Sequence, residues 1–227
     1  MSFYQIFAFV ERLRKEAIGE PSWIAEKKAY EYADHPAKVV AILKLVRAAH
    51  GVSALDELRQ CGLFIDFGVT MRCVNDCRME IYFLLENFPK SSENVDKFVK
   101  SFFETTMDGY LTAETHVVQN KKIRNAMVRV MKGQHDEETS QTIERVYKTF
   151  SGYVHANYAH IMEVYNGATR DFNLNGVPEA QQRLMRQETV EIAANSVLHM
   201  TAFIARTLSM NNLLREVIHF IRAREPR

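Results

Sequence analysis

The sequence predicts an all-α fold, a multi-helix bundle without a sheet. Apolar residues recur every three to four positions through most of the chain, which is the period of an amphipathic helix. Only five prolines and nine glycines interrupt the 227 residues, and no alternation of apolar and polar residues indicates a strand. Because each amphipathic helix must bury its apolar stripe against another, a bundle is the simplest arrangement.

Helix boundaries follow from residues that start or end helices. Glycine ends helices because it adopts the left-handed conformation without strain, and proline cannot continue a helix. Serine and asparagine begin helices by accepting hydrogen bonds from free N–H groups of the first turn. In chain order, the predicted boundaries are Gly19, Pro36, Gly51, Ser53, Gly62, Pro89, Ser91 and Ser92, Gly133, Ser140, Asn166 and Gly167, Pro178 and Asn211, with a kink at Gly109.

Two polar stretches, 132–140 and 170–178, are predicted loops. Pro178 leads from the second loop into a long helix that ends near Met210. Neither loop demands a domain boundary. We therefore expect a single helical domain over residues 1–227, in which the N-terminal helices of residues 1–50 pack on a bundle core of residues 53–221.

Composition narrows the class of protein. Hydrophobic residues make up 47% and charged residues 25%, as in globular proteins, and the formal charge of +1 produces no general basic field for nucleic acid or membrane. No run of about eighteen apolar residues predicts a membrane span. The odd cysteine count, Cys61, Cys73 and Cys77, favours reduced thiols and a cytoplasmic location.

The strongest candidate site is a charged row in the apolar stretch from Phe64 to Phe88. Arg72, Asp76 and Glu80 recur every four residues, so they stack on one helix face. Charges inside a bundle persist only if they are paired, and arginine suits phosphate because its planar fork makes two parallel hydrogen bonds. The row is therefore either a set of structural ion pairs or part of a pocket.

A second candidate site is Ser151 with His155, four residues apart on one face. A histidine near neutrality can act as general acid or base, although a helix histidine also serves as a hydrogen-bonded core residue. His160 is poorly placed to share a metal with His155, because four rather than five residues return to the same face.

Two further groups of polar residues are weaker candidates. Glu191, Asn195 and His199 align on the long helix, as a ligand site or as a polar joint between helices. A basic stretch either follows phosphates or forms a solvated helix face. That stretch consists of Lys121, Lys122, Arg124, Arg129 and Lys132.

Cofactor and metal motifs are missing from the sequence. It contains no glycine-rich phosphate loop, no His-Glu-x-x-His and no serine elbow. Cys73 and Cys77 lie one helical turn apart but have no second pair to complete four ligands. The sequence therefore predicts neither a cofactor nor a metal centre.

The order of these features resembles a family. An arginine followed four residues later by an acid, then Glu80-Ile-Tyr-Phe-Leu-Leu, then Ser151-x-x-x-His155, looks like uncharacterised bacterial proteins related to the HEPN superfamily (higher eukaryotes and prokaryotes nucleotide-binding domains). The resemblance covers roughly residues 55–165. Arg129-Val-Met-Lys-Gly-Gln-His135 also fits the family's spacing of an arginine and a histidine, with Val130 in place of the usual polar neighbour.

The resemblance implies an RNA-directed effector of a bacterial stress or phage-defence system, a metal-independent ribonuclease. Arg72, Asp76, Glu80 and His155 would line its pocket, with His155 moving a proton and an arginine stabilising the charged transition state. By analogy with toxin–antitoxin members, RNA, an antitoxin or defence protein and a second copy of the chain would be its partners. The alternative is a non-catalytic helical interaction or regulatory module, in which the same residues are structural pairs.

Overall fold

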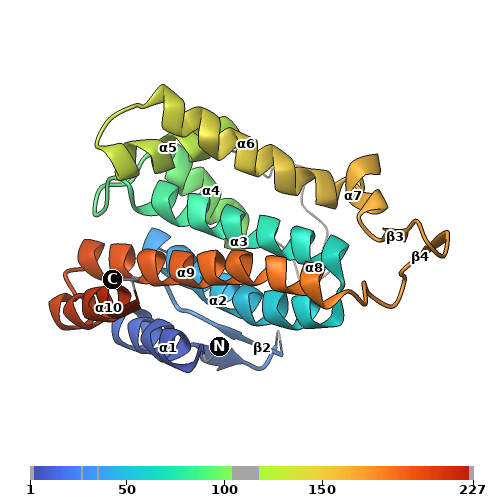
Figure 1. Ribbon diagram of the computed structural model, residues 1–227. Coiled ribbons are helices and arrows are strands. Elements are labelled where there is room, and N and C mark those ends of the chain that lie inside the picture. The colour runs from blue at the N-terminus through green and yellow to red at the C-terminus, as the bar shows by residue number, and fades with distance from the viewer. Residues whose placement is uncertain (1–2, 27, 35, 104–117, 225–227) are drawn as a thin grey trace.

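The computed structural model describes residues 3–26, 28–34, 36–103 and 118–224 (Figure 1), so the predicted kink at Gly109 lies outside the described residues. The long helices are α1 (Tyr4–Ile18), α2 (Ala37–Cys61), α3 (Phe64–Leu85), α4 (Glu93–Phe103), α5 (Asn120–Lys132), α6 (Glu137–Val154), α9 (Gln187–Thr207) and α10 (Asn211–Arg224). The short helices are α7 (Tyr158–Met162) and α8 (Ala180–Met185). The all-α prediction is confirmed.

Helix α3 lies in the middle of the molecule, between two layers of helices. Figure 1 shows α2 and α9 on one side of it, with α1 and α10 beyond them, and α5 and α6 on the opposite side. One main hydrophobic cluster joins α1, α2, α3, α5, α9 and α10. Fully buried Leu13, Leu45, Ile81 and Met200 illustrate how many helices contribute to it.

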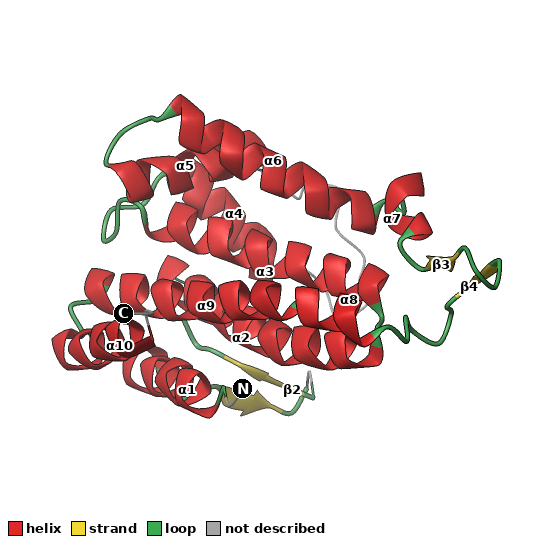
Figure 2. Cartoon of the chain, in the orientation of Figure 1, coloured by secondary structure: helices red, strands yellow, loops and turns green. Residues whose placement is uncertain are grey.

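Short strands accompany the helices (Figure 2). Strands β1 (Ser22–Ile24) and β2 (Ala29–Glu31) form one antiparallel hairpin, where Trp23 pairs with Tyr30 at 5.1 Å between ring centroids. Strands β3 (Tyr165–Asn166) and β4 (Asp171–Phe172) form another, which projects from the bundle beside α7. With two or three residues each, these strands are too short to show an alternating pattern in the sequence.

The helix end predicted at Gly51 and the helix start predicted at Ser53 are both wrong, because α2 continues through them to Cys61. Gly51 is buried where α2 meets α3, and a Cβ there would lie 2.7 Å from Val74 Cγ2. The glycine therefore permits close packing of two helices instead of ending one. The predicted division between residues 1–50 and 53–221 accordingly falls inside α2, whereas the predicted end at Gly62 is confirmed.

Three other boundaries differ from the prediction. Asp136, and not Ser140, caps α6, because its carboxylate accepts a hydrogen bond from the Thr139 N–H at 2.8 Å. Helix α6 ends at Val154, so the predicted continuation to Asn166 is wrong. The long helix predicted from Pro178 is divided into α8 and α9 at Arg186.

A second close approach attaches α6 to α3. Gly68 is buried in α3, and a Cβ at this position would overlap the ring of Tyr153 from α6. The Tyr153 hydroxyl donates to Glu163 Oε1 at 2.7 Å, and Glu163 also accepts from Arg186 at 2.6 Å. Arg186 lies over the ring of Phe64 at 3.6 Å, so this network fixes the C-terminal end of α6 to the start of α3.

We predict that Gly68→Ala lowers the free energy of unfolding by about 1–3 kcal/mol, because the added methyl overpacks the contact with Tyr153. The higher helix propensity of alanine, about 1 kcal/mol, offsets only part of this cost. Urea unfolding measures the change. Gly167→Ala is the control, since nothing lies within 4 Å of a Cβ there. If Gly68→Ala also destabilises a Tyr153→Ala background, the ring is not the cause.

Candidate ligand pocket between helices α3, α5 and α6

The charged row of α3 divides between two neighbouring helices. Arg72 Nη2 lies 3.2 Å from Asp76 Oδ1, and the Arg72 guanidinium stacks on the Tyr147 ring of α6 at 3.5 Å. Glu80 instead pairs with Lys44 of α2 at 2.7 Å. Eight residues turn a helix by about 80° beyond two full turns, which explains why Arg72 and Glu80 face different neighbours. The spacing thus brings Arg72 and Asp76 together and leaves Glu80 with α2.

Asp76 is an unusual carboxyl. Burial raises its pKa from 3.8 to about 6, Arg72 opposes the rise, and the negative charge of Glu80 adds to it. A hydrogen bond with Cys77 is the main cause that lowers the pKa of the nearby Cys73 thiol to about 6, while the pKa of Cys77 is raised. The middle of α3 therefore carries several ionisable groups close together.

His155 lies apart from the other predicted site residues. It is exposed at the C-cap of α6, and the structure shows no contact of its side chain with the charged row in the described residues. Tyr147, which touches Arg72, precedes His155 by eight residues, or roughly 12 Å of helix. His160 packs instead on Tyr153, with 4.2 Å between ring centroids, and against the surface of Gly152.

The arginine and histidine of the family-like spacing also lie apart. Arg129 on α5 donates to Glu86 through both Nε and Nη2, the latter at 2.9 Å. His135 is exposed in the α5–α6 loop and lies 3.4 Å from Glu137. No contact among the described residues joins His135 to Arg129. Arg129 therefore connects α5 to the end of α3.

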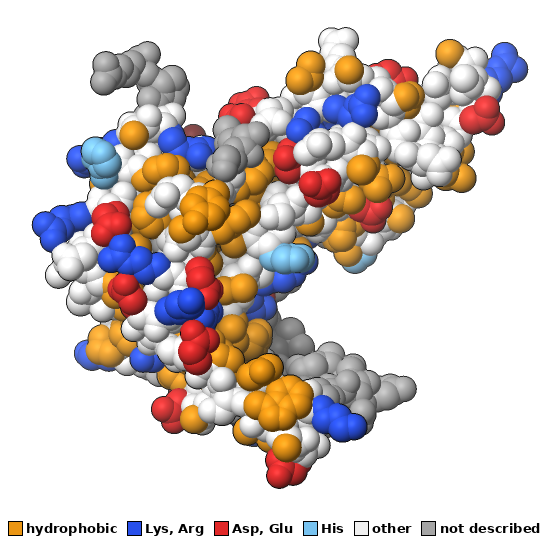
Figure 3. All heavy atoms as spheres, turned by 90° about the horizontal axis from the view of Figure 1, so that it is seen from below, with side chains coloured by type: hydrophobic (Ala, Val, Ile, Leu, Met, Phe, Trp, Pro, Cys, Tyr) orange, Lys and Arg blue, Asp and Glu red, His pale blue; other side chains and the backbone are white. Residues whose placement is uncertain are grey.

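The remaining polar groups lie mainly at the surface. Asn195 and His199 are exposed on α9, and Glu191 accepts from Gln187 at 3.2 Å. Lys121 and Lys122 at the start of α5 are exposed too. In Figure 3, basic and acidic side chains are interspersed over the face shown, as the balanced composition leads one to expect.

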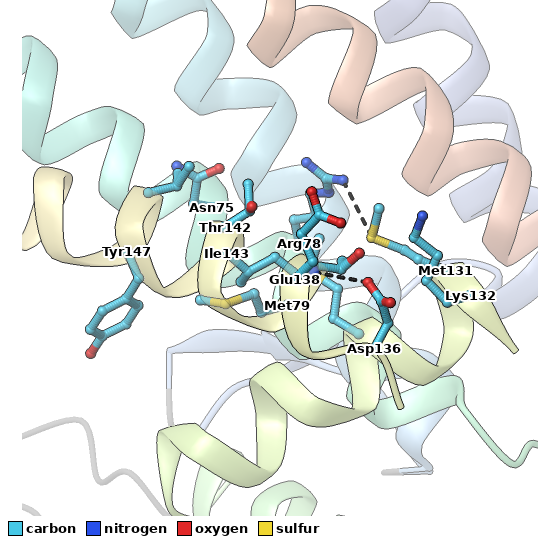
Figure 4. Close-up of a pocket in the computed structure, with 13 residues that line it drawn as sticks. Asn75, Arg78, Met79, Met131, Lys132, Asp136, Glu138, Thr142, Ile143 and Tyr147 are labelled. Carbon is cyan, nitrogen blue, oxygen red and sulfur yellow. Dashed lines mark hydrogen bonds between the residues drawn. The ribbon is translucent and has the colours of Figure 1, made fainter. Parts of the chain in front are cut away.

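A cavity of about 420 Å³ opens beside the Arg72–Tyr147 contact, between α3, α5 and α6 (Figure 4). Its volume falls in the range of small-molecule sites. Its apolar walls come from all three helices: Met79 of α3, Met127 and Met131 of α5, and Ile143 and Val146 of α6. The cavity therefore has room and apolar surface for the body of an organic molecule.

The polar floor of the cavity comes from α3. Asn75 and Arg78 line it, and both Asn75 Nδ2 and Arg78 Nε are buried without a hydrogen-bond partner among the described residues. Arg78 Nη2 makes a long contact, 3.9 Å, with Met131 Sδ, and the guanidinium also interacts with the Tyr82 hydroxyl. Arg72 Nε and Nη1, beside the cavity, are likewise buried and unpartnered. A buried donor without a partner lowers the stability of the fold by about 1–3 kcal/mol. An acceptor placed beside these groups would therefore stabilise the protein.

The rim of the cavity carries charges of both signs. Lys132, Asp136 and Glu138 line the opening where α5 turns into α6. The Asp136 carboxylate is committed to capping α6, and its hydrogen bond to Thr139 lowers its pKa. The buried atoms of Asn75 and Arg78 that have no partner in the described residues are thus donors, and two carboxylates line the rim.

Asn75 and Arg78 were not among the site residues predicted from the sequence. Asn75 is three residues beyond Arg72 and Arg78 three further, a spacing that also keeps residues on neighbouring parts of one helix face. Only the packing of α5 and α6 on this flank turns these residues into the floor of a cavity. Arg72, which the sequence did single out, lies at its margin.

Comparison with models of protein families, with curated proteins and with solved structures found no match. Within the described residues, no helix has the length and apolarity needed to cross a membrane. The same residues contain no group of three or more His, Cys, Asp or Glu side chains that could hold a metal ion.

We predict that Asp76→Asn stabilises the protein above pH 6. The pKa of Asp76 is higher in the folded than in the unfolded chain, so its ionisation destabilises the fold as pH rises from 3.8 to about 6. The free energy of unfolding should rise by about 1 kcal/mol, after allowance for solvent screening of the Asp76 side chain, which is 36% exposed.

Urea unfolding across this pH range measures the gain. The two proteins should converge below 3.8, where the carboxyl is neutral. A constant difference at all pH values would contradict the assignment.

Proposed function

We propose that this protein is a non-catalytic helical regulatory module that binds a small molecule in the cavity between α3, α5 and α6. The observation that carries the proposal is the combination of a 420 Å³ cavity with buried donors, on Asn75 and Arg78, that have no acceptor. A ligand there contacts three helices at once. Its binding would therefore set how the α5–α6 pair sits on α3, which is a means of regulation.

The separation of the histidines favours ligand binding over the histidine-dependent ribonuclease. General acid–base catalysis needs a proton-transferring group within hydrogen-bond reach of the reacting atom. His155 and His135 are exposed outside the cavity, and the residues that line it include no histidine. The ribonuclease activity implied by the HEPN resemblance stays a prediction, as do RNA and protein partners, homodimerisation and a cytoplasmic location.

We predict that Thr142→Phe blocks ligand binding, because Thr142 lines the cavity and a larger side chain fills it. Small-molecule fragments of neutral, cationic and anionic character are the probes, and the shift in melting temperature is the measurement. A fragment at about one hundred times its Kd should stabilise the parent by about 2.7 kcal/mol and leave Thr142→Phe unchanged. Thr149→Phe, exposed on the same helix outside the cavity, is the matched control.

An RNA-cleavage assay tests the competing function. Purified parent protein and His155→Ala are incubated with single-stranded RNA without added metal. We expect no cleavage by either protein. Cleavage by the parent that His155→Ala abolishes would overturn the non-catalytic proposal and support the ribonuclease.

A further inference from the structure

We infer that the ligand of this cavity is an amphiphilic organic anion, whose oxyanion head, a carboxylate or a phosphate, lies against Asn75 and Arg78. The inference rests on the proposed function and adds the chemical class of the ligand. It follows from the separation of polar donors and apolar surface within one cavity.

The head group is assigned by the unpartnered atoms. Asn75 Nδ2 and Arg78 Nε are both donors, and they come from residues three apart on one helix, with Cβ atoms about 5–6 Å apart. Arginine is a donor only, so an acceptor on a ligand would satisfy it, and an ionised oxygen gives the strongest hydrogen bond. Two donors on one face match the two oxygens that a carboxylate or a phosphate presents.

Neighbouring charges reinforce this choice. Arg72 lies one turn before Asn75 and keeps two buried N–H groups unpartnered beside the cavity. Lys132 is at the rim and adds positive charge. The acidic groups that line the cavity, Asp136 and Glu138, are at the exposed end of α6, where water screens them. Because Arg72 is paired with Asp76, the positive charge at the floor of the cavity is that of Arg78.

The apolar lining of the cavity indicates that the rest of the ligand is hydrocarbon. Met79, Met127, Ile143 and Val146 offer no donors, so this part of the cavity accepts hydrocarbon. Methionine side chains are flexible and adapt to chains of different shape. Figure 4 shows Met131 and Lys132 at one end of the group of lining residues and Tyr147 at the other.

The test uses octanoate, octyl phosphate, octanol and inorganic phosphate as probes. Methyl NMR signals of ¹³C-methionine report binding at the cavity, since Met79, Met127 and Met131 line it while Met200, buried in the core, is an internal control. We expect octanoate or octyl phosphate to shift the signals of the three cavity methionines. The Kd of octanol should be higher by about tenfold or more. Whichever anion binds more tightly identifies the head group, and inorganic phosphate alone should bind weakly.

Arg78→Met is the decisive variant, because it keeps an unbranched apolar stem and removes the donors. It should weaken binding of the anion by about tenfold or more and leave octanol binding unchanged. Arg78 contacts the Met131 sulfur and the Tyr82 hydroxyl, so the melting temperature of the variant is measured first to show that it folds. Asn75→Ala is a second variant that should also weaken anion binding. Arg215→Met is the matched control, because Arg215 is exposed on α10.

The outcomes separate the two proposals. If octanol binds as tightly as the anions, or if Arg78→Met and Asn75→Ala leave anion binding unchanged, the anion assignment is overturned and the pocket remains. If the anions bind but shift signals other than those of the three cavity methionines, the site is overturned. If none of the probes binds, both the anion assignment and the proposed small-molecule function fail.

Discussion

Close packing against both sides of α3 is the constraint on which the rest of the structure depends. On one side, Gly51 lets α2 approach Val74 of α3, and on the other side Gly68 lets Tyr153 of α6 lie against the helix backbone. A side chain at either glycine would push a neighbouring helix outward. Because α3 lies between the two layers, its position determines both the main core and the walls of the cavity.

The helical class was predictable from the sequence because the apolar period repeats over most of the chain, whereas several boundaries were not. A glycine in a sequence signals either a helix end or a close approach, and only tertiary packing shows that Gly62 is the first and Gly51 the second. Ser140 and Asp136 are both good caps, and the choice between them depends on where the α5–α6 turn begins. The hairpins were missed because two or three residues carry no period.

The candidate site was predictable in part. The charged row pointed to α3, and Arg72 and Asp76 are indeed paired on its partly buried flank. Which flank α5 and α6 cover is a tertiary property, so Asn75 and Arg78 gave no separate signal. His155 shared a helix face with Ser151 in the sequence, but α6 ends beside it, and its side chain is consequently exposed.

The attachment of α5 and α6 has a consequence for how the molecule opens. The main contacts of both helices are with α3, with each other and, for α6, with α7, while α1, α2, α9 and α10 pack among themselves and on α3. Although α5 contributes to the main core, we expect this pair of helices to open as a unit at a lower free energy than global unfolding. Hydrogen exchange would then proceed in two stages, the outer pair before the inner layers. A ligand in the cavity would slow only the first stage of exchange, because it contacts both the α5–α6 pair and α3.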